Sequence, residues 1–338
     1  MSAEAVTLTR KDFQSDQEVR WCPGCGDYGI LAAIQFVLPE LGVKPEEMVF
    51  VSGIGCAARL PYYMNTYGMH GIHGRAPALA TGVALARPDL HVWVIGGDGD
   101  MLSIGGNHLI HALRRNVNLK IIMFNNQIYG LTKGQYSPTS ELGKVTKSTP
   151  FGSLDHPFNP VAVALGAEAT FVARTHDMDR KHMMEIFRRA HEHQGAAFVE
   201  IYQNCNVFND GAFDGILDKS IRSSMLIDLR HGEPITFDDG AKGIAAEGRF
   251  GLRIVDVAEV GIENVLVHDA QRPEPTLAFA LAHLSTGPTM PTPVGIFRDV
   301  ERPVYDIEVA RQIAEAAESR GAGDLETLLT SGPTWTVD

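Results

Sequence analysis

Five short apolar runs recur along the chain, each bounded by glycine or polar residues. They are MVFVSG (48–53), HVWVIGG (91–97), LKIIMFNN (119–126), AEATFVAR (167–174) and AAFVEIYQ (196–203). None of them alternates strictly between apolar and polar positions. Such continuous runs are typical of strands that are buried on both faces, as in a parallel sheet.

Between these runs lie longer segments with helical periodicity, at residues 29–38, 75–86, 103–115 and 178–193. Strands that alternate with helices predict an α/β fold with a doubly wound, mostly parallel sheet and helices on both faces. In such a sheet, ligands bind beyond the carboxyl ends of the strands, where loops lead into the next helices. We therefore expect functional residues at those loops.

The pattern changes after the fifth run. Segments rich in Gly, Pro and charge, such as GEPITFDDGAKG (232–243), then interrupt the periodic pieces. We interpret residues 1–205 as the α/β domain and residues 206–338 as a C-terminal extension that wraps a partner subunit. A small independent domain is the alternative interpretation of the second part.

Composition excludes several classes of function. The 338 residues are 44% hydrophobic and carry a net charge of −12, which creates no field that attracts nucleic acid or an anionic membrane. No stretch approaches the roughly 20 apolar residues of a membrane span, and the start, MSAEAVTLTRKDFQ, lacks the apolar core of a secretory signal. We expect a cytoplasmic protein, in which four cysteines indicate metal binding or redox chemistry rather than disulfides.

The run HVWVIGG leads directly into a Gly-Asp-Gly-Asp sequence formed by Gly97, Asp98, Gly99 and Asp100. Glycines allow close approach of a ligand to the backbone, and amides at a helix start can bind phosphate. The Asp98 carboxylate is a hard oxygen ligand of the kind that Mg²⁺ prefers. The sequence thus predicts a phosphate and magnesium site after this strand.

The next strand ends in Asn125 and Asn126, which stand 27 and 28 positions after Asp98. That spacing corresponds to one strand-helix-strand unit, whose strands bring their carboxyl ends together. An asparagine oxygen and the carbonyl of Ile128 could then complete the magnesium site. Alternatively, Asp98 caps the following helix and the asparagines form a turn.

All the cysteines stand near expected strand ends or tight turns. Cys22 and Cys25 flank a Pro-Gly turn in WCPGCG, Cys56 follows the first run, and Cys205 follows the fifth. Four thiolates suffice for one [4Fe–4S] cluster. A structural zinc site, a redox-active Cys-x-x-C pair and buried inert cysteines are the alternatives.

The Gly-Asp-Gly and Asn-Asn pair resembles the diphosphate-binding signature of thiamine diphosphate enzymes. Together with the other motifs it resembles the β subunit of 2-oxoacid:ferredoxin oxidoreductases, and implies the diphosphate-half type of thiamine diphosphate domain. The motifs are WCPGCG, SGIGC, MHGIHGRA, GGDGD with IGGNH, FNNQIYGLTKGQ and NCNVFND, in this order from Trp21 to Asp210.

This resemblance implies roles for individual residues. Cys22, Cys25, Cys56 and Cys205 would bind a [4Fe–4S] cluster, and Asp98, Asn126 and the Ile128 carbonyl would bind magnesium. His73 matches a position beside the cofactor, or is a supporting histidine, and Arg75 faces a substrate carboxylate or caps the sheet. The residues expected to contact thiamine diphosphate are Gly55, Cys56, His73, Gly97, Asp98, Gly99, Asp100, Asn126, Ile128, Gly130 and Leu131.

Substrate choice depends on the segment Gly130-Leu131-Thr132-Lys133-Gly134-Gln135. In the pyruvate-using relatives this segment looks like a Ser-Asn-Thr-Gly-Gly-Gln run, whereas a segment with a lysine at position 133 resembles that of the 2-oxoglutarate-type and broad-specificity enzymes. Lys133 could pair with the distal carboxylate of a dicarboxylic substrate, or be a solvated surface lysine. We expect 2-oxoglutarate, with pyruvate or a branched-chain 2-oxoacid as alternatives.

The resemblance further implies oxidative decarboxylation, in which coenzyme A accepts the acyl group and ferredoxin receives the electrons. The reaction is reversible in principle, so the same enzyme could fix CO₂. The chain offers only one half of a thiamine diphosphate site, so we expect an α subunit, an (αβ)₂ assembly and no activity of this chain alone. A non-redox thiamine diphosphate decarboxylase or synthase and a zinc-stapled scaffold are the competing hypotheses.

Overall fold

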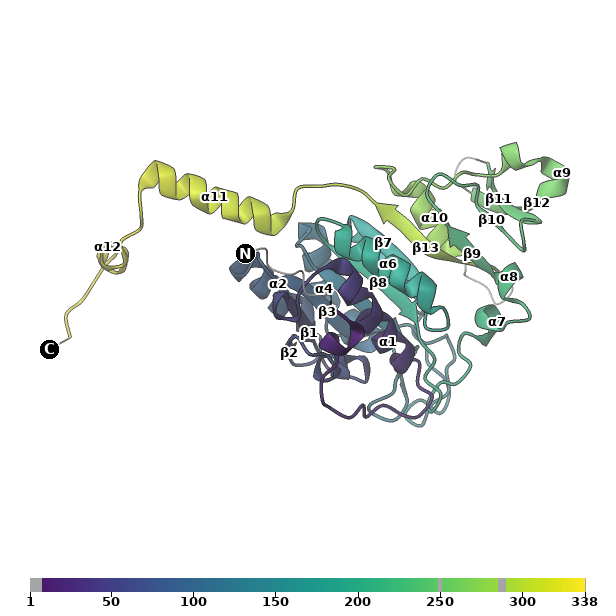
Figure 1. Ribbon diagram of the computed structural model, residues 1–338, viewed down its shortest axis with the longest axis horizontal. Coiled ribbons are helices and arrows are strands. Elements are labelled where there is room, and N and C mark those ends of the chain that lie inside the picture. Colours follow the sequence, from purple (N-terminus) through teal and green to yellow (C-terminus); the bar gives the residue numbers. More distant parts are fainter. Residues whose placement is uncertain (1–7, 249–250, 285–289, 338) are drawn as a thin grey trace.

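An eight-stranded sheet runs through the centre of the computed structural model, which describes residues 8–248, 251–284 and 290–337 (Figure 1). Its order is β2-β1-β3-β4-β8-β7-β13-β9, and all neighbours are parallel except β13 and β7. The predicted doubly wound, mostly parallel α/β fold is confirmed. The strands are β1 (Met48–Ser52), β2 (Tyr67–His70), β3 (His91–Gly97), β4 (Lys120–Asn125), β7 (Phe171–His176), β8 (Ala197–Tyr202), β9 (Leu226–Leu229) and β13 (Thr292–Asp299).

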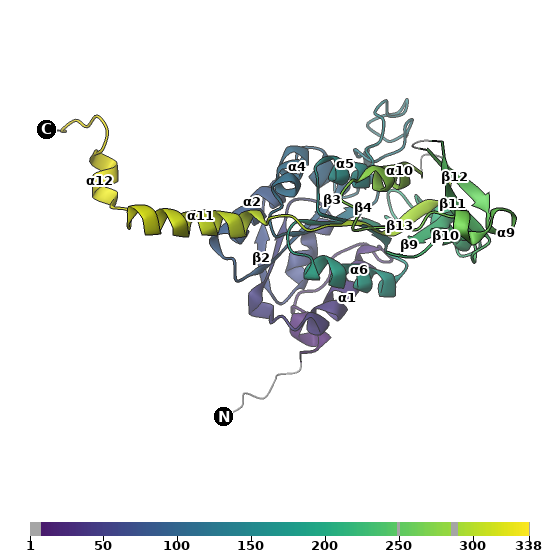
Figure 2. The same cartoon turned by 90° about the horizontal axis from the view of Figure 1, so that it is seen from above.

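Helices cover both faces of the sheet (Figure 2). Successive residues of a strand point to opposite faces, so Val92 and Val94 pack into one core while Trp93 and Ile95 pack into the other. The first core lies under α2 (Ala76–Ala86), α4 (Gly106–Arg115), α5 (Pro160–Gly166) and α10 (Thr276–Leu284), and the second under α1 (Asp27–Val37) and α6 (Arg180–Glu192).

The five predicted runs all form strands, and the largest shift is at β7. It begins at Phe171 rather than residue 167, because a turn with Glu168 at a φ of 62° follows α5. The helix expected over 103–115 is α4, which begins at Gly106, and a further short helix, α3 (Asp98–Leu102), precedes it. They are separated at Gly105, where an added Cβ would lie 2.3 Å from the Asp100 carbonyl oxygen.

The chain after residue 205 contributes to the same sheet. Strand β13 pairs with β7, and β9 pairs with β13 at the edge. A small antiparallel sheet packs beside them, formed by β10 (Thr236–Phe237), β11 (Lys242–Glu247) and β12 (Gly251–Asp256). The short helices of this part are α7 (Asp214–Leu217), α8 (Arg222–Met225) and α9 (Val257–Val260).

The last helices, α11 (Tyr305–Arg320) and α12 (Leu325–Thr330), project away from the body as an arm (Figures 1 and 2). The arm is held at its base, where the Asn118 amide donates to Asp306 Oδ1 at 2.9 Å. Just before the arm, the Arg302 guanidinium donates to the carbonyls of Arg114 and Glu168. The direction of the arm is therefore fixed at the sheet.

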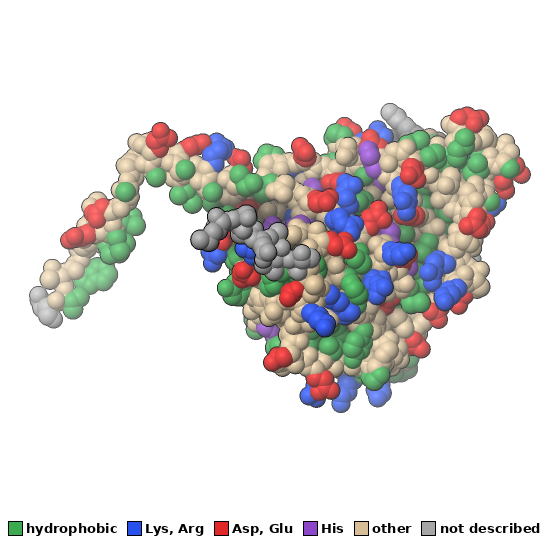
Figure 3. Space-filling model, in the orientation of Figure 1, with side chains coloured by type: hydrophobic (Ala, Val, Ile, Leu, Met, Phe, Trp, Pro, Cys, Tyr) green, Lys and Arg blue, Asp and Glu red, His purple; other side chains and the backbone are tan. Residues whose placement is uncertain are grey.

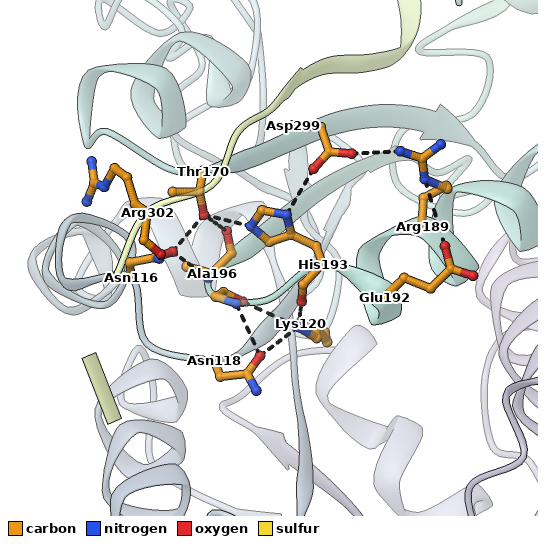
Figure 4. A network of polar contacts seen from close by, with 11 residues as sticks. Asn116, Asn118, Lys120, Thr170, Arg189, Glu192, His193, Ala196, Asp299 and Arg302 are labelled. Carbon is orange, nitrogen blue, oxygen red and sulfur yellow. Dashed lines mark hydrogen bonds and ion pairs between the residues drawn. The ribbon is translucent and has the colours of Figure 1, made fainter. Parts of the chain in front are cut away.

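A polar network crosses the amino edge of the sheet (Figure 4). Lys120, at the start of β4, is buried and donates to the carbonyls of His193 and Gly195 and to Asn118 Oδ1. Burial lowers the pKa of Lys120 to about 7. This network lies at the opposite end of the strands from the loops predicted to bind ligands.

The remaining elements are short. A two-stranded hairpin of β5 (Ile128–Tyr129) and β6 (Gln135–Tyr136) follows β4. Short 3₁₀ helices lie at Arg10–Phe13, Leu38–Leu41, Pro45–Glu47, Ala57–Tyr63 and Ile262–Asn264. Among the described residues, no helix is both long and apolar enough to cross a membrane.

Candidate functional site

A cavity of about 510 Å³ opens at the carboxyl ends of the central strands. Its walls come from the loops after β1, β3 and β4 and from the hairpin, which is where ligands bind in folds of this class. It brings together all eleven residues that the sequence predicts to contact the cofactor. The lining residues are Ile54, Gly55, Cys56, Ala57, His73, Gly97, Asp98, Gly99, Asp100, Asn126, Ile128, Tyr129, Gly130, Leu131, Thr132 and Gln135.

Asp98 is the first residue of α3 and lies on the cavity wall, although only 2% of its surface is exposed. Its Oδ2 accepts hydrogen bonds from Ser137 Oγ and Thr139 Oγ1, both at 2.5 Å. Burial raises the pKa of Asp98 to about 6, and the two hydroxyls lessen the shift. The carboxylate is held by neutral donors only.

The structure separates the roles of the two neighbouring asparagines. Asn125 is not among the lining residues and donates to Glu200 Oε1 at 2.7 Å, beside the buried ion pair of Glu200 with Arg174. Asn126 lines the cavity, where its Oδ1 accepts from the Ile128 amide at 3.2 Å. Asn126 and Ile128 therefore stand on the same wall as Asp98.

These residues fit a magnesium ion and a diphosphate. In the described part of the chain, no lysine or arginine neutralises the buried Asp98 carboxylate, so its charge is available to a bound cation. Glycines leave room beside it, and a Cβ added to Gly99 would lie 2.2 Å from the Tyr129 ring. Asp98, Asn126 and the Ile128 carbonyl would hold the metal.

His73 lines the cavity and makes a short contact with Asp100. The His73 Nδ1 lies 2.6 Å from Asp100 Oδ1, which also accepts from the amides of Ile54 and Gly74. Asp100 is buried in a space that only glycine leaves open, because a Cβ on Gly53 would lie 2.0 Å from its Oδ2. A carboxylate so fixed orients the imidazole toward the cavity.

Cysteine thiols lie at the cavity wall, and Cys56 is itself one of the lining residues. A Cβ added to Gly130 would lie 3.6 Å from the sulfurs of both Cys56 and Cys205, so both thiols are neighbours of this lining glycine. Cys25 Sγ accepts from Gln203 Nε2 at 3.3 Å. Burial, followed by the negative charge of Asp27, raises the pKa of the Cys25 thiol and raises that of Cys56 to about 12.

Cys22, the fourth cysteine, is exposed and interacts electrostatically with Cys56. Among the residues that the structure describes, no three His, Cys, Asp or Glu side chains converge closely enough to hold a single metal ion. A [4Fe–4S] cluster has a different requirement, because each thiolate binds a separate iron atom at a corner of the cluster. Electrostatic interactions link Cys25 with Cys56 and Cys205, and Cys56 with Cys22, so all these cysteines lie near one another.

Two predicted substrate residues lie off the cavity. Lys133 is exposed, has a φ of 73°, and sits at the turn of the hairpin, while Leu131, Thr132 and Gln135 line the wall. Arg75 donates to the Ile104 carbonyl at 3.2 Å. Their substrate roles therefore stay predictions.

Sequence reasoning missed Ser137, Thr139 and Tyr129. The two hydroxyl residues follow the hairpin in a segment without periodicity, so no spacing relates them to Asp98. Tyr129 stands three positions after Asn126, and its hydroxyl donates to the Gly99 carbonyl at 3.0 Å. Its place shortly after the Asn-Asn half of the diphosphate signature was the one available signal.

The fold and this cavity define the class of the protein. Residues 53–201 match the family model described as "Thiamine pyrophosphate enzyme, C-terminal TPP binding domain". This range begins just after β1 and ends in β8, so it spans all the strand ends that form the cavity.

Longer comparisons identify the family within this class. The chain is 59% identical over 330 residues to the 2-oxoglutarate oxidoreductase subunit KorB of Mycobacterium tuberculosis, covering 97% of this chain and 88% of the relative. The chain belongs to the KorB family, the β subunits of 2-oxoacid:ferredoxin oxidoreductases.

Two further relatives agree with this assignment. The β subunit of the 2-oxoacid:ferredoxin oxidoreductase of Saccharolobus solfataricus is 48% identical over 192 residues, which is 56% of this chain and 63% of the relative. The structure resembles a chain of the 2-oxoglutarate:ferredoxin oxidoreductase from Magnetococcus marinus, solved with 2-oxoglutarate, coenzyme A and succinyl-CoA bound. That match has a TM-score of 0.76 and 33% identity, and covers 97% of both chains.

Proposed function

We propose that this chain is the catalytic β subunit of a cytoplasmic 2-oxoglutarate:ferredoxin oxidoreductase. The complete enzyme would convert 2-oxoglutarate and coenzyme A to succinyl-CoA and CO₂. The electrons released would pass through one [4Fe–4S] cluster to ferredoxin. Both the family membership and the 2-oxoglutarate bound in the Magnetococcus marinus structure support this choice.

One observation carries the redox part of the proposal. Gly130 lines the cavity that holds Asp98, and the sulfurs of Cys56 and Cys205 lie in van der Waals range of a Cβ at that glycine. A cluster bound by these thiols would lie beside a cofactor bound in the cavity, because Cys56 and Gly130 both line it. That proximity supports the proposal over a thiamine diphosphate enzyme without redox chemistry.

Bound thiamine diphosphate supplies a carbanion for attack on the keto carbon and a sink for its electrons. The chain's own residues then bind and orient. Asp98, Asn126 and the Ile128 carbonyl would hold magnesium and thereby the diphosphate. His73, fixed by Asp100, would present its second ring nitrogen to the reacting groups.

Cys22, Cys25, Cys56 and Cys205 would bind the cluster. Their surroundings favour the neutral thiol when no iron is present, because burial and the Asp27 carboxylate raise the pKa of Cys25 and Cys56. Iron cations would reverse this preference and stabilise the thiolates. Cluster binding should therefore release protons and rigidify the Cys22–Cys25 turn.

A partner subunit would complete the site. Relatives of this chain are named as β subunits, and the cavity is open at the carboxyl edge. The arm of α11 and α12 also needs a partner surface, since its large apolar side chains are exposed (Figure 3). An α subunit that binds the arm and covers the cavity would form the (αβ)₂ assembly.

The test is ferredoxin reduction by this chain co-purified anaerobically with its α subunit. We expect reduction to require both 2-oxoglutarate and coenzyme A, and Asp98→Asn to abolish it together with thiamine diphosphate binding. Asp89→Asn is the matched control, because Asp89 is exposed and pairs with Arg87, two positions earlier in the chain. Full activity of Asp98→Asn, or activity that needs no coenzyme A, would contradict the proposal.

A further inference from the structure

The segment after the hairpin returns to the candidate metal site. Ser137 and Thr139 each place a hydroxyl 2.5 Å from Asp98 Oδ2, and all three side chains are 2% exposed. Both hydroxyls meet the same carboxylate oxygen. The other oxygen, Oδ1, is engaged by neither of them, although Asp98 lines the cavity.

The two hydroxyls are themselves held in place. Ser140 Oγ donates to the Gln127 carbonyl at 2.5 Å and accepts from the Ser137 amide at 2.7 Å, which ties the segment to the end of β4. Thr139 Oγ1 also lies 2.9 Å from Asn125 Oδ1. A hydroxyl has one proton, and the charged Asp98 oxygen is the stronger of the two acceptors.

We propose that Ser137 and Thr139 are positioning residues for the metal-binding carboxylate of Asp98. They fix its rotamer by occupying Oδ2, so that Oδ1 is presented to the cation. This inference rests on the proposed function, in which Asp98 is a magnesium ligand.

Neutral donors suit this task better than cationic ones. A lysine or arginine beside Asp98 would also fix the carboxylate, but its charge would repel the incoming cation. Two hydroxyls orient the ligand and leave its negative charge for the metal. Partners in this position behind a metal ligand are worth roughly 10-fold to 100-fold in metal affinity.

The test measures metal affinity rather than turnover. The αβ complex, stripped of magnesium and thiamine diphosphate, would be titrated with Mn²⁺ at saturating thiamine diphosphate, and free Mn²⁺ followed by electron paramagnetic resonance. We expect Ser137→Ala and Thr139→Val each to weaken Mn²⁺ binding at least 10-fold. Thr139→Ser, which keeps the hydroxyl, should bind within about 3-fold of the unchanged protein.

Two control variants distinguish a failure of the positioning role from a failure of the proposed metal site. Ser148→Ala removes an exposed hydroxyl of the same segment and should leave the affinity unchanged. Asp98→Asn reports on the metal site itself, and equal thermal unfolding of the stripped complexes would exclude misfolding. If Asp98→Asn loses Mn²⁺ while Ser137→Ala and Thr139→Val retain full affinity, the positioning role is wrong. If Asp98→Asn retains Mn²⁺, the proposed metal site itself is wrong.

Discussion

Lys133 is the residue on which we expect substrate choice to depend. It stands on the hairpin from which residues 128–132 and Gln135 line the cavity, and its side chain is exposed in the isolated chain. A bound α subunit would exclude water around it and strengthen its attraction for a second substrate carboxylate. Its ammonium group would then distinguish dicarboxylic from monocarboxylic 2-oxoacids.

We therefore expect Lys133→Ala in the αβ complex to raise the KM for 2-oxoglutarate about 10-fold or more, consistent with loss of one charge-assisted hydrogen bond. The KM for pyruvate, which has no distal carboxylate, should change little. Lys147→Ala is the control, since Lys147 is an exposed lysine on the neighbouring segment. Equal changes for both substrates would show that Lys133 does not read the distal carboxylate.

The buried Lys120 should make the free energy of unfolding depend on pH. Its pKa is lowered from 10.5 to about 7 by burial, so between these values the folded chain holds it neutral while the unfolded chain keeps it protonated. The unfolded state binds more protons in this window, so the free energy of unfolding should rise with pH by about 1 kcal/mol per unit. Below pH 7 both states are protonated and this contribution is constant.

Denaturant unfolding at several pH values between 7 and 10 would measure this slope. Lys120→Met should remove it, whereas Lys181→Met, at an exposed position on α6, should retain it. Equal slopes in Lys120→Met and the unchanged chain would show that Lys120 stays charged when buried.

At the scale of elements, the hairpin of β5 and β6 borders both the cavity and the thiols. Gly130 follows β5 directly and lines the cavity together with Cys56. An alanine Cβ at Gly130 would make ordinary contacts of 3.6 Å with the sulfurs of Cys56 and Cys205, and a branched side chain would extend further toward them. Gly130 therefore leaves the space beside the thiols open.

We predict that Gly130→Ala keeps its full iron content and that Gly130→Val loses most of it, because the branched side chain displaces the thiols. Iron and labile sulfide per chain would be measured after anaerobic purification. Gly143→Val provides a control, since nothing lies within 4 Å of a Cβ there, although its φ of 82° adds local strain. Full iron in Gly130→Val would mean that the cluster lies elsewhere.

Motifs at strand ends were the part of the site that the sequence could predict. Asp98 and Asn126 follow adjacent parallel strands, so the fold alone brings them together. Ser137 and Thr139 could not be found this way, because they reach Asp98 through an irregular segment. Strands β9 and β13 were also missed, since they lie in a region rich in Gly, Pro and charge and pair with strands far away in sequence.

At the scale of the whole molecule, the arm is the clearest sign of a missing neighbour. Ile313, Leu325, Leu328 and Leu329 are each at least 65% exposed, and Trp335 is 83% exposed. The base of the arm is fixed to the sheet by Asn118 and the segment around Arg302. A fixed arm with apolar side chains is suited to binding a partner surface.

We expect Leu328→Asp combined with Leu329→Asp to weaken assembly with the α subunit at least 10-fold, as measured by analytical ultracentrifugation. The isolated chain should unfold at an unchanged temperature, because these side chains are exposed in it. Ile262→Asp, at a half-exposed position on the body, is the control. Normal assembly of the doubly substituted chain would contradict the role of the arm.

The central claim is that the four cysteines hold a redox cluster beside the cavity. Iron, acid-labile sulfide and zinc would be measured on the anaerobically purified αβ complex, with electron paramagnetic resonance spectra before and after dithionite. We predict about four irons and four sulfides per β chain, with a signal that appears on reduction and is lost in Cys205→Ala. Stoichiometric zinc without labile sulfide would contradict the claim and leave a thiamine diphosphate enzyme without redox chemistry.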